Sequence, residues 1–503
     1  MDKHWFDGME AKIPRGGVRT RFAPSPTGYM HVGNFRTALY TWLLAKKENG
    51  IFILRIEDTD TTRFVEGATE IIISTLKGAG LSYDEGPDIG GPAAPYTQSE
   101  RRQLYKPYAE YLCEKGAAYY CFCAGGDDEI STGDGDAVDK TAHYAPADDP
   151  CRNLEYDDSK KRAEAGGHFA IRMKAPREGS TTVEDMVFGT VTTQNKELDD
   201  MILLKRDGLP TYNFANVVDD HLMGVTHVLR GSEYITSAPK YNLLYGAFGW
   251  KIPKYITVSM INRDATHKLS KRKGDPTYDD LITAGYLPEA VLNYVALLGW
   301  SPGGEREIFT LSEMIDVFSI SGLSKSPAIF DIEKLTHFNA EYIRAMAPET
   351  FAAVAEPYIR GIAKNGGIPA YEIAALLQPR CEKLSDIPAM LDWYRALPEY
   401  DTELYVHKKS KTDEFISLDM LRAAGTVLEE LPDWTAEAIH DALISLAEQL
   451  GVKNATLLWP VRIAVTGRAV TPGGAVEICR ILGRSESLRR IAIGIGRLEG
   501  LVI

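Results

Sequence analysis

The chain has 503 residues, of which 44% are hydrophobic and 25% are charged, and its formal net charge is −14 at pH 7. This acidic balance excludes a protein that coats nucleic acid by bulk charge and leaves only local basic patches to meet a polyanion. No apolar run reaches the roughly 18 residues that a membrane span needs. Because a domain holds roughly 100–200 residues, the length predicts several domains.

The N-terminus and the cysteines indicate the compartment. The opening sequence, MDKHWFDGMEAKIPRGG, contains no apolar stretch that could act as a signal peptide. Six cysteines in a chain of this length do not form a disulfide framework. We therefore expect a cytoplasmic protein with reduced thiols.

The first ninety residues alternate predicted strands with predicted helices. Residues 18–22 form a short apolar strand that ends at a PSPTG turn, and residues 35–43 have apolar positions at helical spacing. Residues 51–56 are an apolar run interrupted only by Arg55, which is typical of a buried parallel strand, and residues 64–77 are again helical. This order predicts a parallel, doubly wound α/β sheet.

The pattern changes from about residue 96. A helix-like stretch over residues 98–115 is followed by AYYCFC, by an acidic, glycine-rich segment over 124–140 and by short alternating strands. This combination favours an α+β insertion. The α/β pattern returns near residue 200, and from about residue 330 the chain is mostly helical.

The loop RFAPSPTGYMHVGN, residues 21–34, ends a predicted strand, where ligands bind in parallel α/β sheets. Its prolines limit loop motion, and Gly28 and Gly33 allow close backbone approach. The helix that starts near Asn34 directs free N–H groups at the loop, as a phosphate site requires. Neither common glycine-rich nucleotide motif is present. The loop alone leaves open whether His31 is catalytic or a structural hydrogen-bonding group.

A second segment, HKLSKRKGDP at residues 267–276, gathers Lys268, Lys271, Arg272 and Lys273 beside a glycine. It is either a solvated basic loop or nucleic-acid patch, or a mobile loop whose cations neutralise a polyphosphate during its cleavage.

Together these two segments resemble the HIGH and KMSKS signatures of class I aminoacyl-tRNA synthetases, here HVGN at 31–34 and KLSKR at 268–272. The sequences around these segments resemble those of bacterial glutamyl-tRNA synthetases. The matching stretches occur in the same order, from about residue 18 to residue 500. The matching stretches are RFAPSPTG, LRIEDTD, DEGPDIGGP, PYTQSER, PTYNFANVVDDHLMGVTHVLRGSE, LSKRKG, LPEAVLNYVALLGW and WPVRIAVTG.

The resemblance implies a glutamate–tRNA ligase. ATP would activate L-glutamate to glutamyl-adenylate with release of pyrophosphate, and the 3′ end of tRNA(Glu) would accept the glutamyl group with release of AMP. Mg²⁺ would accompany ATP, and the expected state is a monomer without membrane contact. One alternative is a non-discriminating form that also glutamylates tRNA(Gln). Another is a non-catalytic tRNA-binding paralogue, which would be expected to carry damage at His31, Arg21 or Lys271, yet all three are present.

Two shorter relatives are also possible rivals. A glutamyl-queuosine synthetase lacks a long helical C-terminal module, and a small-molecule nucleotidyltransferase would leave RIEDTD and that module unexplained.

The resemblance also implies the architecture. We expect a class I Rossmann-type parallel sheet with an α+β insertion for the tRNA acceptor end, followed by an all-α anticodon-binding region. The expected boundaries are 1–95 and 200–265 for the halves of the catalytic domain, 96–199 for the insertion, 266–335 for the KMSKS loop and stem contacts, and 336–503 for the helical region.

The family assigns roles to particular positions. His31, Lys268 and Lys271 would be catalytic, Arg21 would bind the glutamate side-chain carboxylate and Glu57 its α-ammonium. The remaining glutamate-binding positions are Ala23, Ser25, Tyr212, Asn216, Arg230 and Tyr234. The ATP-binding positions are Pro24, Ser25, Thr27, Gly28, His31, Gly33, Asn34, Glu233, Lys268, Ser270, Lys271 and Arg272.

Four further positions belong to these expectations. Arg380 matches a family arginine at the third anticodon base, where a guanidinium can read or stack on a base. Asp219, Asp220 and His221 are residue types that can ligate a metal, but the family resemblance implies structural roles for them.

A zinc site is expected at Cys121, Cys123 and Cys151, because some family members bind a structural zinc with C-x-C and a later C-x-H. This chain departs from that pattern, since Asn153 stands where the histidine would be. His143 or Tyr144 could supply the fourth ligand. The alternative is three reduced cysteines without metal.

Overall fold

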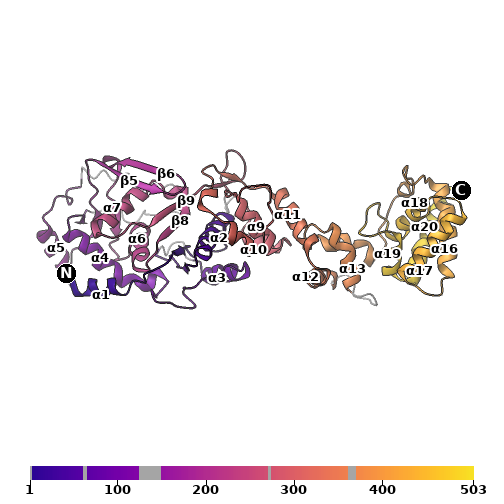
Figure 1. Cartoon of the computed structure of the whole chain (residues 1–503), viewed down its shortest axis with the longest axis horizontal. Helices are drawn as coiled ribbons and strands as arrows, with labels where there is room; N and C mark the ends of the chain where they lie inside the picture. Colours follow the sequence, from indigo (N-terminus) through magenta and orange to yellow (C-terminus); the bar gives the residue numbers. More distant parts are fainter. Residues whose placement is uncertain (1–2, 60–64, 124–148, 270–273, 361–369, 503) are drawn as a thin grey trace. The chain divides into compact units, whose positions relative to one another are not determined.

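The computed structural model describes residues 3–59, 65–123, 149–269, 274–360 and 370–502. The chain divides into two compact units (Figure 1). The N-terminal unit comprises Met1–Ile282 with Pro288–Ile332, and the helical unit comprises Thr283–Leu287 with Glu333–Ile503.

A six-stranded sheet organises the N-terminal unit, in the order β2-β1-β8-β9-β5-β6. Neighbouring strands run parallel except at the β5–β6 hairpin. The strands are β1 (Arg19–Phe22), β2 (Ile51–Leu54), β5 (Ser180–Asp185), β6 (Gly189–Gln194), β8 (His227–Gly231) and β9 (Lys254–Val258). The predicted parallel α/β sheet is confirmed, and it extends to residues 180–194.

Helices cover this sheet because their apolar faces must be buried. Helix α2 (Val32–Lys47) connects β1 to β2 and packs against β1, β2 and β8. Its residues Phe35, Ala38, Leu39 and Leu43 are buried, as the helical spacing predicts. Helix α7 (Ala238–Phe248) packs on β5, and α6 (Tyr212–Leu222) packs on α7 (Figure 1).

A second, antiparallel sheet of β3 (Ala118–Cys121), β4 (Ala170–Met173) and β7 (Ile202–Leu204) belongs to the segment between β2 and α6. Helix α4 (Arg102–Glu114) packs on it, and its buried Tyr105 and Tyr108 share one apolar cluster with Phe214 of α6. The six-stranded and three-stranded sheets of the N-terminal unit are therefore joined by a common core. Its remaining elements are α1 (Lys3–Ala11), α3 (Ala68–Gly78), α5 (Tyr156–Glu164), β10 (Ile261–Asn262), α8 (Tyr278–Thr283), α9 (Pro288–Leu297), α10 (Leu311–Val317) and β11 (Ala328–Ile329).

Helices make up nearly all the regular structure described in the helical unit, as the sequence predicts. Side-chain caps start several of them: Asp413 accepts a hydrogen bond from the backbone N–H of Ile416, and Thr435 accepts one from that of Ala438. The helices are α11 (Ile332–Ala345), α12 (Pro348–Arg360), α13 (Ala370–Leu377), α14 (Ile387–Met390), α15 (Asp392–Arg395), α16 (Glu414–Glu429), α17 (Ala436–Gln449), α18 (Asn454–Thr466), α19 (Ala475–Leu482) and α20 (Arg484–Val502).

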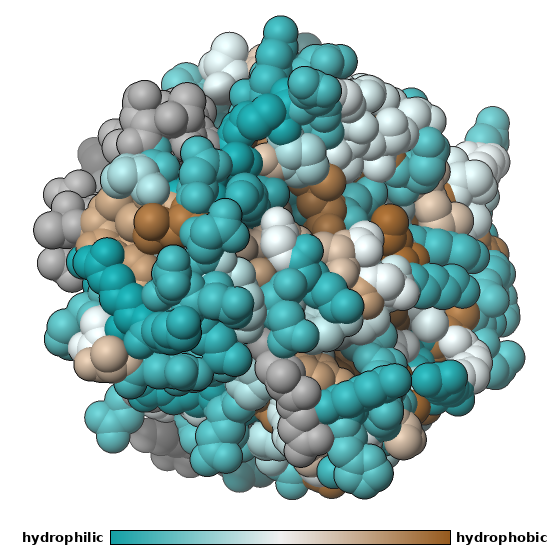
Figure 2. Space-filling model, turned by 90° about the vertical axis from the view of Figure 1, so that its left-hand side faces the viewer, coloured by the Kyte–Doolittle hydropathy of each residue, from teal (hydrophilic) through white to brown (hydrophobic). Residues whose placement is uncertain are grey.

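Short 3₁₀ helices occur in both units. They are η1 (Gln98–Arg101), η3 (Asn195–Glu197), η4 (Ser232–Tyr234), η6 (Ile320–Gly322), η7 (Gln378–Arg380), η8 (Leu384–Asp386) and η9 (Thr402–Tyr405). The face shown in Figure 2 is mostly hydrophilic, with hydrophobic side chains in small groups. Among the helices in the described ranges, none has both the length and the hydropathy to cross a bilayer.

Candidate active site

His31 stands at the N-cap of α2, where the loop after β1 meets the helix. Its Nδ1 accepts a hydrogen bond from the backbone N–H of Gly33, at 3.1 Å. A Cβ on Gly33 would lie 3.3 Å from that Nδ1, so a larger residue would press on the imidazole. The unsatisfied N–H groups and dipole of a helix start favour an anion. The imidazole is thus fixed beside a position suited to phosphate.

The structure brings the His31 loop next to the residues that directly follow the lysine-rich segment. Leu269 donates its backbone N–H to the carbonyl of Ile261 in β10, at 3.1 Å. After the segment, Tyr278 donates to the carbonyl of Met30, at 3.2 Å, and Thr277 pairs with His31. Lys268 pairs with Asn262, whereas Ser270, Lys271 and Arg272 lie outside the described residues. The chain that leaves the lysine-rich segment therefore lies beside the His31 loop.

A buried chain of alternating charges lies beside this loop. Arg21, in β1, donates its Nε to Asp220 Oδ1 at 3.0 Å and its Nη1 to the carbonyl of Leu229 at 3.3 Å. Arg55 contacts both Asp220, at 2.8 Å, and Glu57, at 2.9 Å. Burial alone would raise the pKa of Asp220, but the two guanidinium groups outweigh it and lower that pKa below its usual range. Asp220 thereby holds Arg21 by one edge of its guanidinium.

Glu57 has one oxygen held and one oxygen available. Its Oε1 accepts from Arg55, while its buried Oε2 has no hydrogen-bond partner among the described residues. Burial raises the pKa of Glu57 to about 7, although Arg55 and Arg21 oppose the shift. A buried, partnerless carboxylate oxygen of this kind is a good acceptor for an ammonium group.

Arg230, at the end of β8, is a buried guanidinium surrounded by aromatic rings. It lies 4.6 Å from the ring centroid of Tyr241, 4.9 Å from that of Tyr255 and 5.7 Å from that of Tyr234. Within the described ranges no carboxylate forms an ion pair with it, and its buried Nη2 has no hydrogen-bond partner. Because buried charges are normally paired, this guanidinium indicates an anionic ligand.

Tyr212 links the aromatic surroundings of Arg230 to Glu57. Its ring centroid is 5.7 Å from that of Tyr234. Burial raises the pKa of Tyr212, and the proximity of Tyr234 and Glu57 raises it further. The aromatic walls around Arg230 therefore reach as far as Glu57.

The other predicted positions take the following places. Asn216 donates to the carbonyl of Tyr212 one turn earlier in α6, at 3.0 Å. Glu233 acts electrostatically on Arg36 of α2 and so lies on the side of the His31 helix. Pro24, which follows Ala23, accepts from the N–H of Glu57 at 3.0 Å, and Thr27 donates to Ser25 at 2.9 Å. Gly28 has a φ of 108°, and Asn34 lies in the first turn of α2.

Asp219 and His221 have structural partners. Asp219 accepts from Arg101 at 2.7 Å and from Tyr105 at 2.9 Å. His221 contacts Glu10 of α1 at 2.6 Å, and its ring stacks 3.7 Å from that of Trp250. Together with Asp220, these residues fix α6 in the core.

In the helical unit, Arg380 ends η7 and donates Nη1 to the carbonyl of Thr471. It also lowers the pKa of Arg462, after the larger effect of burial. Two guanidinium groups therefore lie close together in this unit.

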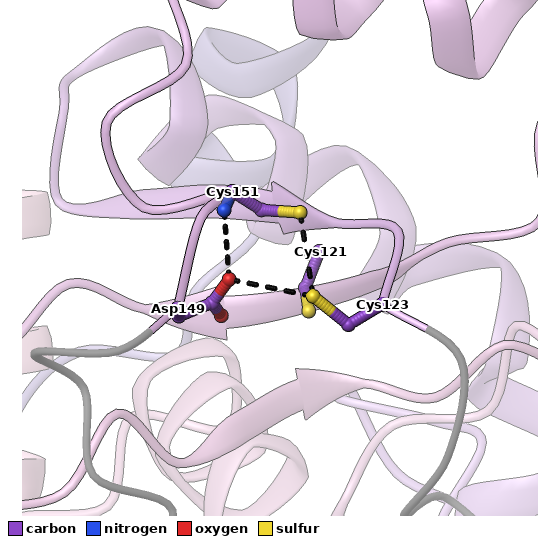
Figure 3. A group of neighbouring side chains, drawn as sticks. All are labelled: Cys121, Cys123, Asp149 and Cys151. Carbon is purple, nitrogen blue, oxygen red and sulfur yellow. Dashed lines mark hydrogen bonds between the residues drawn. The ribbon is translucent and has the colours of Figure 1, made fainter.

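The three predicted cysteines come together at the end of β3 (Figure 3). Cys121, Cys123 and Cys151 share the group with Asp149, and the four ligand atoms all lie within 4.8 Å of one another. Neither His143 nor Tyr144 lies within the described residues.

Sequence reasoning did not single out Arg55 or Asp149. Arg55 stands inside the LRIEDTD stretch, where an arginine flanked by an apolar run and an acidic run is a detectable signal. Asp149 follows an acidic segment and carries no such signal.

Comparison with known proteins identifies the class first. Residues 17–337 match the family described as tRNA synthetases class I (E and Q), catalytic domain, and residues 340–495 match an anticodon binding domain. The parallel sheet, the His31 helix start and the adjoining lysine-rich segment are thus those of a class I aminoacyl-tRNA synthetase.

The relatives define the member of the class. The chain is 52% identical over 482 residues to the glutamate–tRNA ligase of Clostridium acetobutylicum, covering 96% of this chain and 99% of that protein. It is 53% identical over 484 residues to that of Clostridium botulinum strain Hall, with the same coverage. A crystal structure of a glutamate tRNA ligase from Elizabethkingia meningosepticum in complex with its amino acid is 34% identical, with a TM-score of 0.84 over 96% of this chain and 99% of that chain. The chain belongs to the bacterial glutamate–tRNA ligase family, which confirms the resemblance seen in its motifs.

Proposed function

We propose that the chain joins L-glutamate to the 3′ end of tRNA(Glu). The α-carboxylate of glutamate attacks the α-phosphorus of ATP, the bond to pyrophosphate breaks, and glutamyl-adenylate forms. The terminal ribose hydroxyl of the tRNA then takes the glutamyl group and releases AMP. The observation that carries this proposal is the buried Arg230, whose Nη2 has no hydrogen-bond partner among the described residues and whose tyrosine neighbours extend toward the partnerless oxygen of Glu57.

Two guanidinium groups recognise the glutamate side chain in this proposal. Asp220 holds the Nε edge of Arg21, and no described residue accepts a hydrogen bond from its Nη2. Arg230 contributes its partnerless Nη2 from the neighbouring strand. A carboxylate is well matched to such fixed, planar donors. Tyr212, Asn216 and Tyr234, with Ala23 and Ser25, shape the rest of the pocket.

ATP binds at the start of α2. His31 and the N–H groups of the first turn receive its phosphates, and Pro24, Ser25, Thr27, Gly28, Gly33, Asn34 and Glu233 line the nucleotide. Lys268 and Lys271, with Ser270 and Arg272, neutralise the departing pyrophosphate. tRNA synthetases in general use ATP with Mg²⁺, which shields the phosphate charges when bound. Support comes from the pairing of Thr277, the residue after the lysine-rich segment, with His31.

The raised pKa of Glu57 leads to a pH prediction. Below about pH 7 Glu57 is protonated and cannot pair with the ammonium of glutamate. We expect kcat/KM for glutamate to fall about tenfold per pH unit of acidification below this pKa, and to level off above it. Aminoacylation measured from pH 5.5 to 8.5 checks this.

Glu57→Gln should lower the plateau and abolish this acid limb, because an amide does not titrate in this range. The KM for ATP serves as the control and should not follow the same curve. An acid limb that persists unchanged in Glu57→Gln would assign it to another group.

The decisive test is aminoacylation of unfractionated bacterial tRNA with ATP, Mg²⁺ and labelled glutamate, with labelled glutamine in parallel. Glutamate on the tRNA(Glu) species alone establishes a discriminating ligase. Glutamate also on tRNA(Gln) establishes the non-discriminating form. No charging by a protein that binds ATP would contradict the proposal and favour a tRNA-binding paralogue.

The helical unit is proposed to hold the tRNA anticodon, with Arg380 at its third base. Support comes from the position of Arg380 at a helix end beside Thr471 and Arg462. The proposal further includes a cytoplasmic location, where tRNA is charged, and a monomeric chain.

A structural zinc is proposed at Cys121, Cys123 and Cys151, within the insertion that is expected to receive the acceptor end. Zinc favours thiolate ligands in closed four-coordinate sites, and the proximity of these three sulfurs fits that preference. The metal would anchor residues 149–154 to β3 and would take no part in the reaction.

A further inference from the structure

The cysteine group lacks the fourth ligand that the family pattern supplies, since Asn153 replaces the histidine. We propose that Asp149 is the fourth ligand, so that this chain holds zinc in a Cys₃Asp set. The inference rests on the zinc binding proposed above and concerns how this chain completes the site.

The distances between the ligand atoms support this assignment. Cys123 Sγ and Cys151 Sγ are 3.7 Å apart, and Cys123 Sγ and Asp149 Oδ1 are 3.6 Å apart. A tetrahedral zinc with Zn–S of about 2.3 Å and Zn–O of about 2.0–2.2 Å requires S···S edges of about 3.8 Å and S···O edges of about 3.5–3.7 Å. These two edges, out of the six in such a tetrahedron, agree with one that includes the carboxylate, and all four ligand atoms lie within 4.8 Å of one another.

The local backbone sets Asp149 and Cys151 in place together. Cys151 donates its N–H to Asp149 Oδ1 at 2.8 Å, and Arg152 donates to the carbonyl of Asp149 at 3.2 Å. A single tight turn therefore aims both ligand atoms at Cys123 (Figure 3). Phe122 donates its N–H to Cys151 Sγ at 3.3 Å, a contact that stabilises a thiolate.

A second contact orients the carboxylate. Tyr119, two residues before Cys121 in β3, donates its hydroxyl to Asp149 Oδ2 at 2.8 Å. This leaves Oδ1 as the oxygen that faces Cys123. Asp149, Cys121 and Cys151 are all buried. Because zinc binds cysteines as thiolates, a metal here would offset the charge that its ligands acquire when they lose their protons.

The test compares zinc affinity in full-length variants by competition with a chelator, with zinc content measured by mass spectrometry. Asp149→Asn keeps the size of the side chain and an oxygen for the Cys151 N–H, and Asp149→Ala removes both. We expect Asp149→Asn to lose at least about 10- to 100-fold in zinc affinity. Substitution of residues that only orient the metal ligands typically costs this much, and loss of a ligand should cost no less. His143→Ala and Tyr144→Phe are the matched controls and should bind zinc as the unmodified chain does.

Cobalt substitution gives a second readout. The unmodified chain should show the intense visible bands of tetrahedral cobalt, and Asp149→Asn should alter them while thiolate-to-cobalt charge transfer remains. The Asp149 assignment is wrong if the unmodified chain binds one zinc and Asp149→Asn binds zinc as tightly. It is also wrong if His143→Ala or Tyr144→Phe loses the zinc instead. If the unmodified chain binds no zinc, both this assignment and the zinc proposal fail, while the ligase proposal stands on its charging assay.

Discussion

Replacing Arg230 with methionine is expected to lower kcat/KM for glutamate by about 10²- to 10⁴-fold. Methionine fills the aromatic surround but leaves the carboxylate of the substrate buried without one of its cations. Removing one partner of a buried charge pair costs about 3–5 kcal/mol, which corresponds to that factor. Aminoacylation at varied glutamate, with saturating tRNA and ATP, measures the effect.

A matched control is available in the same unit. Arg306 lies over the ring of Phe309 at 4.7 Å, but its side chain is 58% exposed and pairs with Glu313. Arg306→Met should change kcat/KM less than about twofold, because an exposed pair contributes little. The KM for ATP should stay the same in both variants. An Arg230→Met enzyme with near-normal kcat/KM for glutamate would refute the role of this guanidinium.

Replacing Asp220 with alanine is expected to destabilise the N-terminal unit by about 3–5 kcal/mol. The substitution leaves Arg21 and Arg55 buried without the carboxylate that they share. Backbone amide hydrogen exchange in the full-length chain measures this change. Amides of β1 and α6 that exchange only when this region unfolds should exchange faster in the variant. Asp220→Asn should lose less, because it keeps a hydrogen-bond acceptor.

The control for this substitution is an exposed ion pair of the same unit. Lys106 and Glu110 lie 3.8 Å apart on the surface of α4, with 57% and 30% of their side chains exposed. Glu110→Ala should cost no more than about 0.5 kcal/mol. Equal exchange rates in Asp220→Ala and Glu110→Ala would show that the buried charge chain does not stabilise the sheet. Asp220→Asn should also weaken glutamate binding if Asp220 orients Arg21, whereas Glu110→Ala should not.

The local sequence is sufficient for the elements that build the sheet. The apolar run of β2 and the helical spacing of α2 predict a strand and a helix because each pattern reflects which face is buried. The strand β1, with the sequence RTRF, has only one apolar residue and carries a weaker signal. The PSPTG turn and His31 follow at the end of β1, so the sequence also gives the location of the proposed phosphate-binding loop. The predominance of helices after residue 330 follows from the same periodicity.

The tertiary structure alone decides which charges meet. Arg21, Arg55 and Asp220 come from β1, from the end of β2 and from α6, and no spacing in the sequence indicates that one carboxylate serves both guanidinium groups. Arg230 reads as an ordinary strand residue until its tyrosine neighbours, up to 25 positions away, prove to enclose it without an acid. Asp149 is one acidic residue among many until the turn before Cys151 brings it to Cys123. Sequence patterns report burial and backbone preference within one element, whereas pairing of charges and ligands depends on which elements pack together.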